Sequence, residues 1–204
     1  MDRKVAGIIL AGGKSSRMGG GDKALHLLAG RPILTHVADR LGRQVDVLAI
    51  NANGDPARFT EFGLAVVADP QPDLGPLGGV LAGLLWARSH ACPCALTVAC
   101  DTPFFPEDLV KRLRDAADQP DRIVQSSSGG RTHPTFALWP VSLAEDLDEF
   151  LRQAGAASMR AYAGARHRPA VVDFAVAGGV DPFFNINTRD DLIAAERIAS
   201  EIEG

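Results

Sequence analysis

Many glycines and several positively charged residues lie together in residues 5–25, VAGIILAGGKSSRMGGGDKAL. A run of apolar residues gives way to glycines, and Lys14, Arg17 and Lys23 follow within one loop. Glycine lets main-chain N–H groups approach an anion closely, and lysine and arginine add charge-assisted contacts to phosphate oxygens. The stretch therefore predicts a triphosphate site, with Arg17 and Lys23 as phosphate clamps. A flexible glycine turn with solvated cations is the simpler alternative.

Two common phosphate motifs are absent from this loop. A P-loop needs a glycine five residues before its Gly-Lys pair, but the residue at that distance from Gly13 and Lys14 is Ile8. The dinucleotide fingerprint GxGxxG also fails, because Gly12 and Gly13 are adjacent. These mismatches argue against a Walker-type NTPase and against a Rossmann oxidoreductase.

Two aspartates are candidates for chemistry beside the loop. Asp101 directly follows an apolar strand, so its carboxylate should project into the cleft at the carboxyl end of the sheet and can hold Mg²⁺. It could instead cap the next helix, but Pro106 and Glu107 place that helix several residues later. Asp69 can accept two neighbouring N–H groups of a nucleobase or bind a ribose hydroxyl, or it is a turn residue before Pro70.

The composition is that of an ordinary globular chain. Its 204 residues, 46% hydrophobic and 23% charged, suffice for one domain with a sizeable core. A formal net charge of −4 and a pI near 5.7 argue against binding to nucleic acid or anionic membranes and favour a small anion as partner. No apolar run has the length of a membrane span, and the N-terminus lacks a secretory signal. We therefore expect a cytoplasmic protein.

Cys92, Cys94 and Cys100 crowd one segment, ACPCALTVAC, without the spacing of a zinc site. We expect reduced, mostly buried thiols that pack as small apolar side chains. Neither these thiols nor Ser15 and Ser16 have an identifiable activating partner, so the sequence does not favour covalent catalysis.

Apolar runs of strand length alternate with helical patterns. The predicted strands are Val5–Leu10, Val45–Ile50, Leu64–Val67 and Ala95–Ala99. Strands that alternate with helices indicate a mainly parallel sheet. The segments RIVQSS and HPTFALW predict an antiparallel or edge pair in the second half. We therefore expect an α/β fold, a single three-layer α/β/α domain.

Five helices are expected, at about 33–41, 79–88, 106–117, 142–153 and 188–202. Pro32 suits the first turn of the first helix. The apolar face of that helix is formed by Ile33, Leu34, Val37, Ala38 and Leu41. Ser142 with Glu145, and Thr188 with Asp191, predict capping boxes for the last two helices.

The pattern L-A-G-G-x-S-x-R-M-G-x-x-x-K, from Leu10 to Lys23, resembles the signature of nucleotidyltransferases, and within that superfamily the chain most resembles the molybdenum cofactor guanylyltransferases. Similar blocks follow in order along almost the whole chain: INAN at 50–53, VVADPQPDLGPLGGVLAG at 66–83, ACDTP at 99–103, THPTFALW at 132–139 and FNINTRDDL at 184–192. The resemblance implies a Rossmann-like nucleotidyltransferase fold, with a nucleotide-binding part at about 1–105 and an acceptor-binding part at about 106–204.

The resemblance also implies roles for individual residues. The implied nucleotide site comprises Leu10, Ala11, Gly12, Gly13, Lys23, Asn51, Asp69 and Asp101. The implied acceptor site comprises Gly78, His133, Asn185 and Asn187. The two asparagines, on one face of a short strand, would face molybdopterin and the metal. The simpler alternatives are a Pro-Gly turn around Gly78, a structural histidine, and asparagines that cap the last helix.

These roles imply transfer of GMP from GTP to the terminal phosphate of molybdenum-bound molybdopterin, with release of pyrophosphate, Mg²⁺ as cofactor, and Arg17, Lys23 and Asp101 as catalytic residues. A molybdopterin cytidylyltransferase shares nearly every block, but LAGG rather than LAAG favours guanine. The short chain and the NINT ending argue against a sugar-phosphate nucleotidyltransferase. Lys23 and Asp101 argue against a non-catalytic carrier, because a carrier does not need a metal at the α-phosphate. Cofactor-insertion or chaperone proteins and apo-molybdoenzymes are expected partners.

Overall fold

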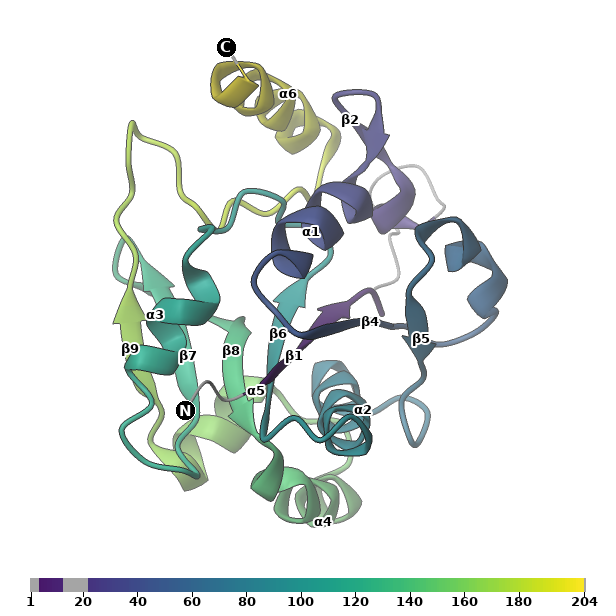
Figure 1. Ribbon diagram of the computed structural model, residues 1–204, viewed down its shortest axis with the longest axis vertical. Helices are drawn as coiled ribbons and strands as arrows, with labels where there is room; N and C mark the ends of the chain where they lie inside the picture. Colours follow the sequence, from purple (N-terminus) through teal and green to yellow (C-terminus); the bar gives the residue numbers. More distant parts are fainter. Residues whose placement is uncertain (1–3, 13–21, 204) are drawn as a thin grey trace.

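The structure, a computed structural model, describes residues 4–12 and 22–203 and contains one seven-stranded sheet (Figure 1). The strands lie in the order β5-β4-β1-β6-β8-β7-β9. Their bounds are β1 Val5–Leu10, β4 Val47–Asn51, β5 Ala65–Val67, β6 Cys94–Ala99, β7 Val124–Ser128, β8 Arg131–Pro140 and β9 Ala170–Asp173. A separate antiparallel pair consists of β2 (Leu27–Leu28) and β3 (Arg31–Pro32).

Strand β8 runs against the rest of the described sheet. It pairs antiparallel with both β6 and β7, whereas the other pairs are parallel. The predicted mainly parallel sheet with an antiparallel pair in its second half is therefore confirmed. The prediction missed β9, which pairs parallel with β7 and forms one edge.

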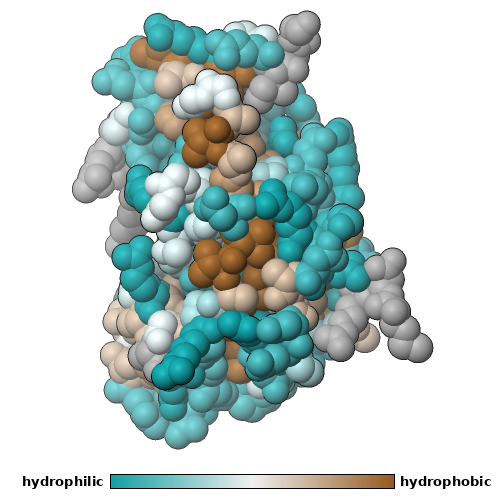
Figure 2. Space-filling view, turned by 90° about the vertical axis from the view of Figure 1, so that its left-hand side faces the viewer, coloured by the Kyte–Doolittle hydropathy of each residue, from teal (hydrophilic) through white to brown (hydrophobic). Residues whose placement is uncertain are grey.

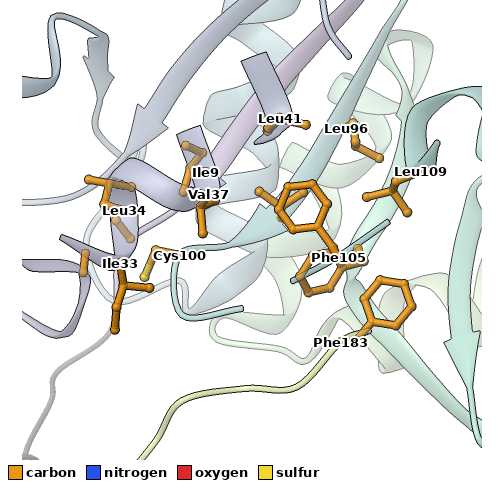
Figure 3. Packing of buried hydrophobic residues seen from close by; sticks show 14 of the residues in the cluster. Ile9, Ile33, Leu34, Val37, Leu41, Leu96, Cys100, Phe105, Leu109 and Phe183 are labelled. Carbon is orange, nitrogen blue, oxygen red and sulfur yellow. The ribbon is translucent and has the colours of Figure 1, made fainter. Parts of the chain in front are cut away.

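Helices cover both faces of the sheet (Figure 1). Their bounds are α1 Ile33–Gly42, α2 Pro76–Ser89, α3 Leu109–Asp115, α4 Ala144–Ala154, α5 Met159–Tyr162 and α6 Arg189–Glu203. Side chains of α1, α3 and α6 pack on one face, and those of α2, α4 and α5 pack on the other. Figure 3 shows part of the hydrophobic cluster on the face covered by α1, α3 and α6, to which Ile9 of β1, Val37 of α1 and Phe105 belong. The three-layer prediction is confirmed.

One predicted helix cap is wrong. Helix α4 begins at Ala144 without a side-chain cap, directly after a 3₁₀ turn at Val141–Leu143. This turn carries Ser142 into the helical run, so Ser142 and Glu145 form no capping box. The Ser142 hydroxyl instead donates to Asp121 at 2.5 Å.

The other predicted cap is confirmed. Thr188 Oγ1 accepts the Asp191 N–H at 3.1 Å, and the Asp191 carboxylate accepts the Thr188 N–H at 2.8 Å. On the apolar face of α1, Ile33, Leu34, Val37 and Leu41 are buried and Ala38 is half-buried. Pro32 is the N-cap residue of this helix rather than part of its first turn. Helix α2 begins at Pro76, earlier than expected.

The side of the molecule that carries β9 shows separate hydrophobic patches among hydrophilic residues (Figure 2). Val171 of β9 and the nearby Val176 are among the exposed apolar side chains. Within residues 4–12 and 22–203, no helix has the length and apolar composition needed to cross a membrane.

Candidate active site

The carboxyl ends of β1, β4 and β6 border a cavity of about 350 Å³. Ligands of parallel sheets collect at this edge. Backbone hydrogen bonds continue past the strand ends, from Ala11 N to Asn51 O at 2.8 Å and from Cys100 N to Leu10 O at 3.2 Å. The predicted site residues that line the cavity are Leu10, Ala11, Gly12, Lys23, Asn51, Asp69, Asp101, Asn185 and Asn187. The fold thus gathers residues from distant blocks of the chain.

Lys23 is the centre of a polar cluster in this cavity. Its Nζ lies 2.5 Å from Asp101 Oδ2, 2.5 Å from Asn187 Oδ1 and 3.4 Å from Asn185 Oδ1. The Lys23 and Asp101 side chains are only 13% and 15% exposed. Water therefore screens this ion pair less than it would a pair on the surface.

Local structure positions the charged pair. Lys23 begins a 3₁₀ turn at Lys23–Leu25, whose N-cap Asp22 accepts the Ala24 N–H at 3.2 Å. Asp101 follows β6 after one residue, and its Oδ1 accepts the Thr102 hydroxyl at 3.2 Å. The strand end and the capped turn therefore direct the two side chains into the same space.

The two asparagines reach this space from the segment before α6. The predicted short strand is wrong, because residues 185–188 belong to no strand of the described sheet. Ile186 instead donates its N–H to the carbonyl of Asp101 at 2.9 Å. The alternation of a strand is retained locally: Ile186 is buried, and Asn185 and Asn187 both reach Lys23.

A second polar cluster holds Asp69. Asn51 Nδ2 donates to Asp69 Oδ1 at 2.8 Å, and Asn53 Nδ2 donates to Oδ2 at 2.9 Å. Asn53 Oδ1 also accepts the Asp69 N–H at 2.9 Å. A carboxylate has about four acceptor positions, so both oxygens of Asp69 keep capacity for a ligand.

The N-terminus of α2 meets the same cavity. Gly75 and Pro76 are part of its lining, and Gly75 adopts φ 66° and ψ −159°, a conformation that favours glycine. The helix has 14 residues, so its dipole adds positive potential at this end. Gly78 does not line the cavity. A Cβ there would lie 2.8 Å from Asp69 Oδ2, so Gly78 leaves room for that carboxylate.

His133 lies outside the cavity lining, in a half-buried chain of hydrogen bonds. Its Nε2 is 2.8 Å from Ser128 Oγ, which donates to Asp181 Oδ1 at 2.7 Å. An ionised carboxylate only accepts, so Ser128 accepts its other bond from His133 Nε2–H. The imidazole stacks on Phe183 with ring centroids 4.5 Å apart. Burial lowers the pKa of His133, although the charge of Asp181 opposes this effect. Contact of His133 with the acceptor stays a prediction.

Five residues singled out in the sequence lie outside the described residues: Gly13, Lys14, Ser15, Ser16 and Arg17. Their roles stay predictions.

A family model described as the MobA-like NTP transferase domain matches residues 7–170 of the chain. The chain belongs to this family. Among its relatives, a molybdenum cofactor guanylyltransferase of Mesorhizobium japonicum is 48% identical in an alignment 203 residues long that covers 97% of each chain. A molybdenum cofactor guanylyltransferase of a Bradyrhizobium species is 48% identical in an alignment 200 residues long that covers 96% of this chain and 93% of the relative.

Solved structures share the fold of this MobA-like chain. Molybdopterin-guanine dinucleotide biosynthesis protein A from Archaeoglobus fulgidus superposes with a TM-score of 0.74 at 21% identity, covering 97% of this chain and 99% of that one. The 4-diphosphocytidyl-2C-methyl-D-erythritol synthase from Anaerococcus prevotii also superposes with a TM-score of 0.74, at 14% identity. The superposition covers 97% of this chain and 96% of that one.

The donor set around Lys23 suits a hard cation. In the described part of this MobA-like chain, no group of three His, Cys, Asp or Glu side chains gathers that could hold a metal. A cation at Asp101 would therefore need other oxygens. The amide oxygens of Asn185 and Asn187 already surround an ammonium at that point. Carboxylate and carbonyl oxygens are ligands that Mg²⁺ accepts, so the residues fit this ion.

The thiol that lines the cavity, that of Cys100, is a poor nucleophile. Cys92 and Cys100 are buried as predicted, and Cys94 is half-buried. Burial, and then the charge of Asp101, raise the pKa of the Cys100 thiol. A protonated thiol beside the cavity packs as an apolar group.

Sequence reasoning missed several residues of the site. Asp22, Cys100 and Thr135 line the cavity, and Asn53 holds Asp69. The motif INAN contained a signal for Asn53, because residues two apart at a strand end point the same way. Nothing in the local pattern signalled that Thr135 of β8 would reach the same cavity.

Proposed function

We propose that this chain is a molybdenum cofactor guanylyltransferase, which transfers GMP from GTP to the terminal phosphate of molybdenum-bound molybdopterin and releases pyrophosphate. Relatives of that name, 48% identical over almost the full length, support the proposal. The observation that carries it is that the Lys23–Asp101 pair and the Asp69 cluster border one cavity. Such a cavity can hold the phosphates and the nucleoside of one nucleotide together.

Lys23 is assigned to the phosphates. Nucleotidyl transfer builds negative charge on the bridging oxygen as pyrophosphate leaves, and a fixed cation stabilises that charge. Arg17 is assigned as a second clamp from the sequence, because a guanidinium can bind two oxygens at once. The N-terminus of α2 adds positive potential on this side. The backbone of Leu10 to Gly12 also lines the cavity and is assigned to the guanine and ribose.

Mg²⁺ is the proposed cofactor, held by Asp101, Asn185 and Asn187. When bound, it neutralises charge on the phosphate oxygens. Thr102 and the Ile186 N–H contribute by fixing the orientation of Asp101 and the position of the asparagines.

Asp69 is assigned to the nucleoside. Its free acceptor positions suit the N1–H and amino group of guanine, or a ribose hydroxyl. Asn51 and Asn53 hold the carboxylate in place from two sides. Cytosine lacks the paired donor edge, so this arrangement favours guanine.

The acceptor phosphate is proposed to attack directly, because it is already a nucleophile and the thiol beside the cavity is buried. In this assignment residues 1–105 bind the nucleotide and residues 106–204 contribute the acceptor side, including Thr135, Asn185 and Asn187. Gly78 acts by leaving room for Asp69. Delivery of the product to insertion proteins or apo-molybdoenzymes stays a prediction.

Initial rates with GTP, CTP and ATP at equal concentration test the proposal, with molybdenum-bound molybdopterin as acceptor and pyrophosphate release as readout. We expect GTP to be preferred by roughly 10⁴, because a site built on hydrogen bonds leaves its groups unpaired with another base. Reactions without acceptor give the background. A faster reaction with CTP would overturn the choice of guanine, and release that does not depend on the acceptor would overturn the transfer.

A further inference from the structure

Lys23 occupies the point at which three side-chain oxygens converge. An ammonium has three N–H donors and no acceptor. The oxygens of Asp101, Asn187 and Asn185 lie 2.5, 2.5 and 3.4 Å from Lys23 Nζ. These oxygens are therefore already used by a cation that belongs to the chain.

The same oxygens are those assigned to Mg²⁺ under the proposed function. Mg²⁺ takes its ligands at about 2.0–2.1 Å, so an ion bound by all three would lie close to the present position of Nζ. Lys23 and the metal need the same lone pairs, and two cations repel at such a separation. The low exposure of Lys23 and Asp101, 13% and 15%, limits screening by water. The ammonium and the metal therefore exclude each other.

A triphosphate in the same cavity offers Lys23 a different set of anionic oxygens. The Lys23 side chain has a flexible four-carbon stem. The backbone of Lys23, in contrast, is held in the capped 3₁₀ turn at Lys23–Leu25. Nζ can therefore move to phosphate oxygens without any change in the turn. Asp101, Asn185 and Asn187 are then free to bind a metal.

We propose that Lys23 closes the metal site of the nucleotide-free protein and that the nucleotide opens it by drawing the ammonium away. This inference rests on the proposed function in taking a nucleoside triphosphate as the ligand. Metal and nucleotide then bind cooperatively, and each raises the affinity for the other by the same factor. Lys23 thus acts both as a phosphate clamp and as a competitor of the metal.

Binding of Mn²⁺ alone to the full chain, followed by electron paramagnetic resonance, tests the exchange. Wild-type protein should bind Mn²⁺ weakly, and Lys23→Met should bind it more tightly by about tenfold or more, in the range of typical coupling between sites. The matched control is Lys111→Met, because Lys111 also pairs with an aspartate, Asp115, at 2.6 Å but on the surface of α3. It should bind Mn²⁺ as the wild type does. Unchanged or weaker binding by folded Lys23→Met would overturn the proposal.

A second pair of variants guards against misfolding and locates the ion. Lys23→Gln also removes the charge and should raise Mn²⁺ affinity in the same way, with circular dichroism as the check of folding. Adding Asn187→Ala to Lys23→Met should abolish the gain. Tight binding that survives this double substitution would overturn the assignment of the ion to these oxygens.

The test is separate from that of the proposed function, because it uses neither GTP nor molybdopterin. Tighter Mn²⁺ binding by Lys23→Met without any GMP transfer by the wild type would support the exchange and reject the guanylyltransferase. Transfer by the wild type with unchanged Mn²⁺ binding by Lys23→Met would reject the exchange alone.

Discussion

Both the nitrogen and the oxygen of the Asn53 side-chain amide form hydrogen bonds with Asp69. Asn53 Nδ2 donates to Asp69 Oδ2 and Asn53 Oδ1 accepts the Asp69 N–H, each at 2.9 Å. Arg58 donates to the carbonyl of Asn53 at 2.8 Å and supports the pair from behind. This reciprocal contact fixes the rotation of the carboxylate that we assign to the nucleoside.

We expect Asn53→Ala to raise KM for GTP about tenfold with little change in kcat. Hydrogen bonds to a charged group are worth about 1.5–3 kcal/mol, and in the role that we assign to it Asp69 binds substrate and transition state alike. Steady-state kinetics with varied GTP and saturating acceptor measure both constants. Gln153→Ala is the control, since Gln153 donates to Glu149 on the exposed side of α4. An unaltered KM in folded Asn53→Ala would remove Asn53 from nucleotide binding.

Asp101→Asn should lower turnover by about a hundredfold or more, because the substitution keeps the shape of the side chain and removes a preorganised charge. Asp115→Asn provides the comparison, since Asp115 also pairs with a lysine but lies on the surface. Pyrophosphate release reports turnover, and circular dichroism reports folding. Nearly normal turnover by Asp101→Asn would exclude Asp101 from the mechanism.

Two glycines of α2 separate effects on the site from effects on the core. A Cβ at Gly78 would lie 2.8 Å from Asp69 Oδ2, and one at Gly83 would lie 2.7 Å from Ile8 Cγ1. We expect Gly78→Ala to raise KM for GTP by displacing Asp69. Gly83→Ala should instead lower the free energy of unfolding by about 1–3 kcal/mol, the usual cost of overpacking. Kinetics and urea unfolding of both variants give the comparison. Equal KM values for the two would contradict the role of Gly78.

Acid should destabilise the protein partly through His133. Burial lowers the pKa of this histidine, so the unfolded chain takes up the proton first, near pH 6.5. The stability that neutral His133 contributes is fully present above that pH and is lost as the pH falls toward the folded-state pKa. Urea unfolding between pH 8 and 5 should show a smaller loss of stability in His133→Gln than in the wild type. The substitution leaves the other histidines in place, so parallel curves would contradict the prediction.

Much of the architecture follows from local sequence patterns. Apolar runs separated by helical periodicities predicted β1, β4, β5 and β6 and the helices between them, because period and polarity are properties of a few consecutive residues. Parallel strands then place their carboxyl ends at one edge, which is why the sequence predicted the glycine loop after Leu10 and Asp101 in one cleft. Resemblance of the sequence blocks added Asn51, Asp69, Asn185 and Asn187.

Only the tertiary structure decided which groups touch. Lys23 and Asn187 are 164 positions apart in the sequence, yet Lys23 Nζ lies 2.5 Å from Asn187 Oδ1. They meet because the segment before α6 returns to the end of β6. The pairing of β9 with β7, the arrival of Thr135 at the cavity and the displacement of Ser142 from its expected cap are of the same kind. Each of these contacts joins residues that are far apart in the sequence. Whether such residues meet is set by the packing of the whole sheet rather than by their neighbours in the chain. Sequence therefore determined which chemical groups are available at the strand ends, and packing determined that the lysine and the proposed metal ligands share one site.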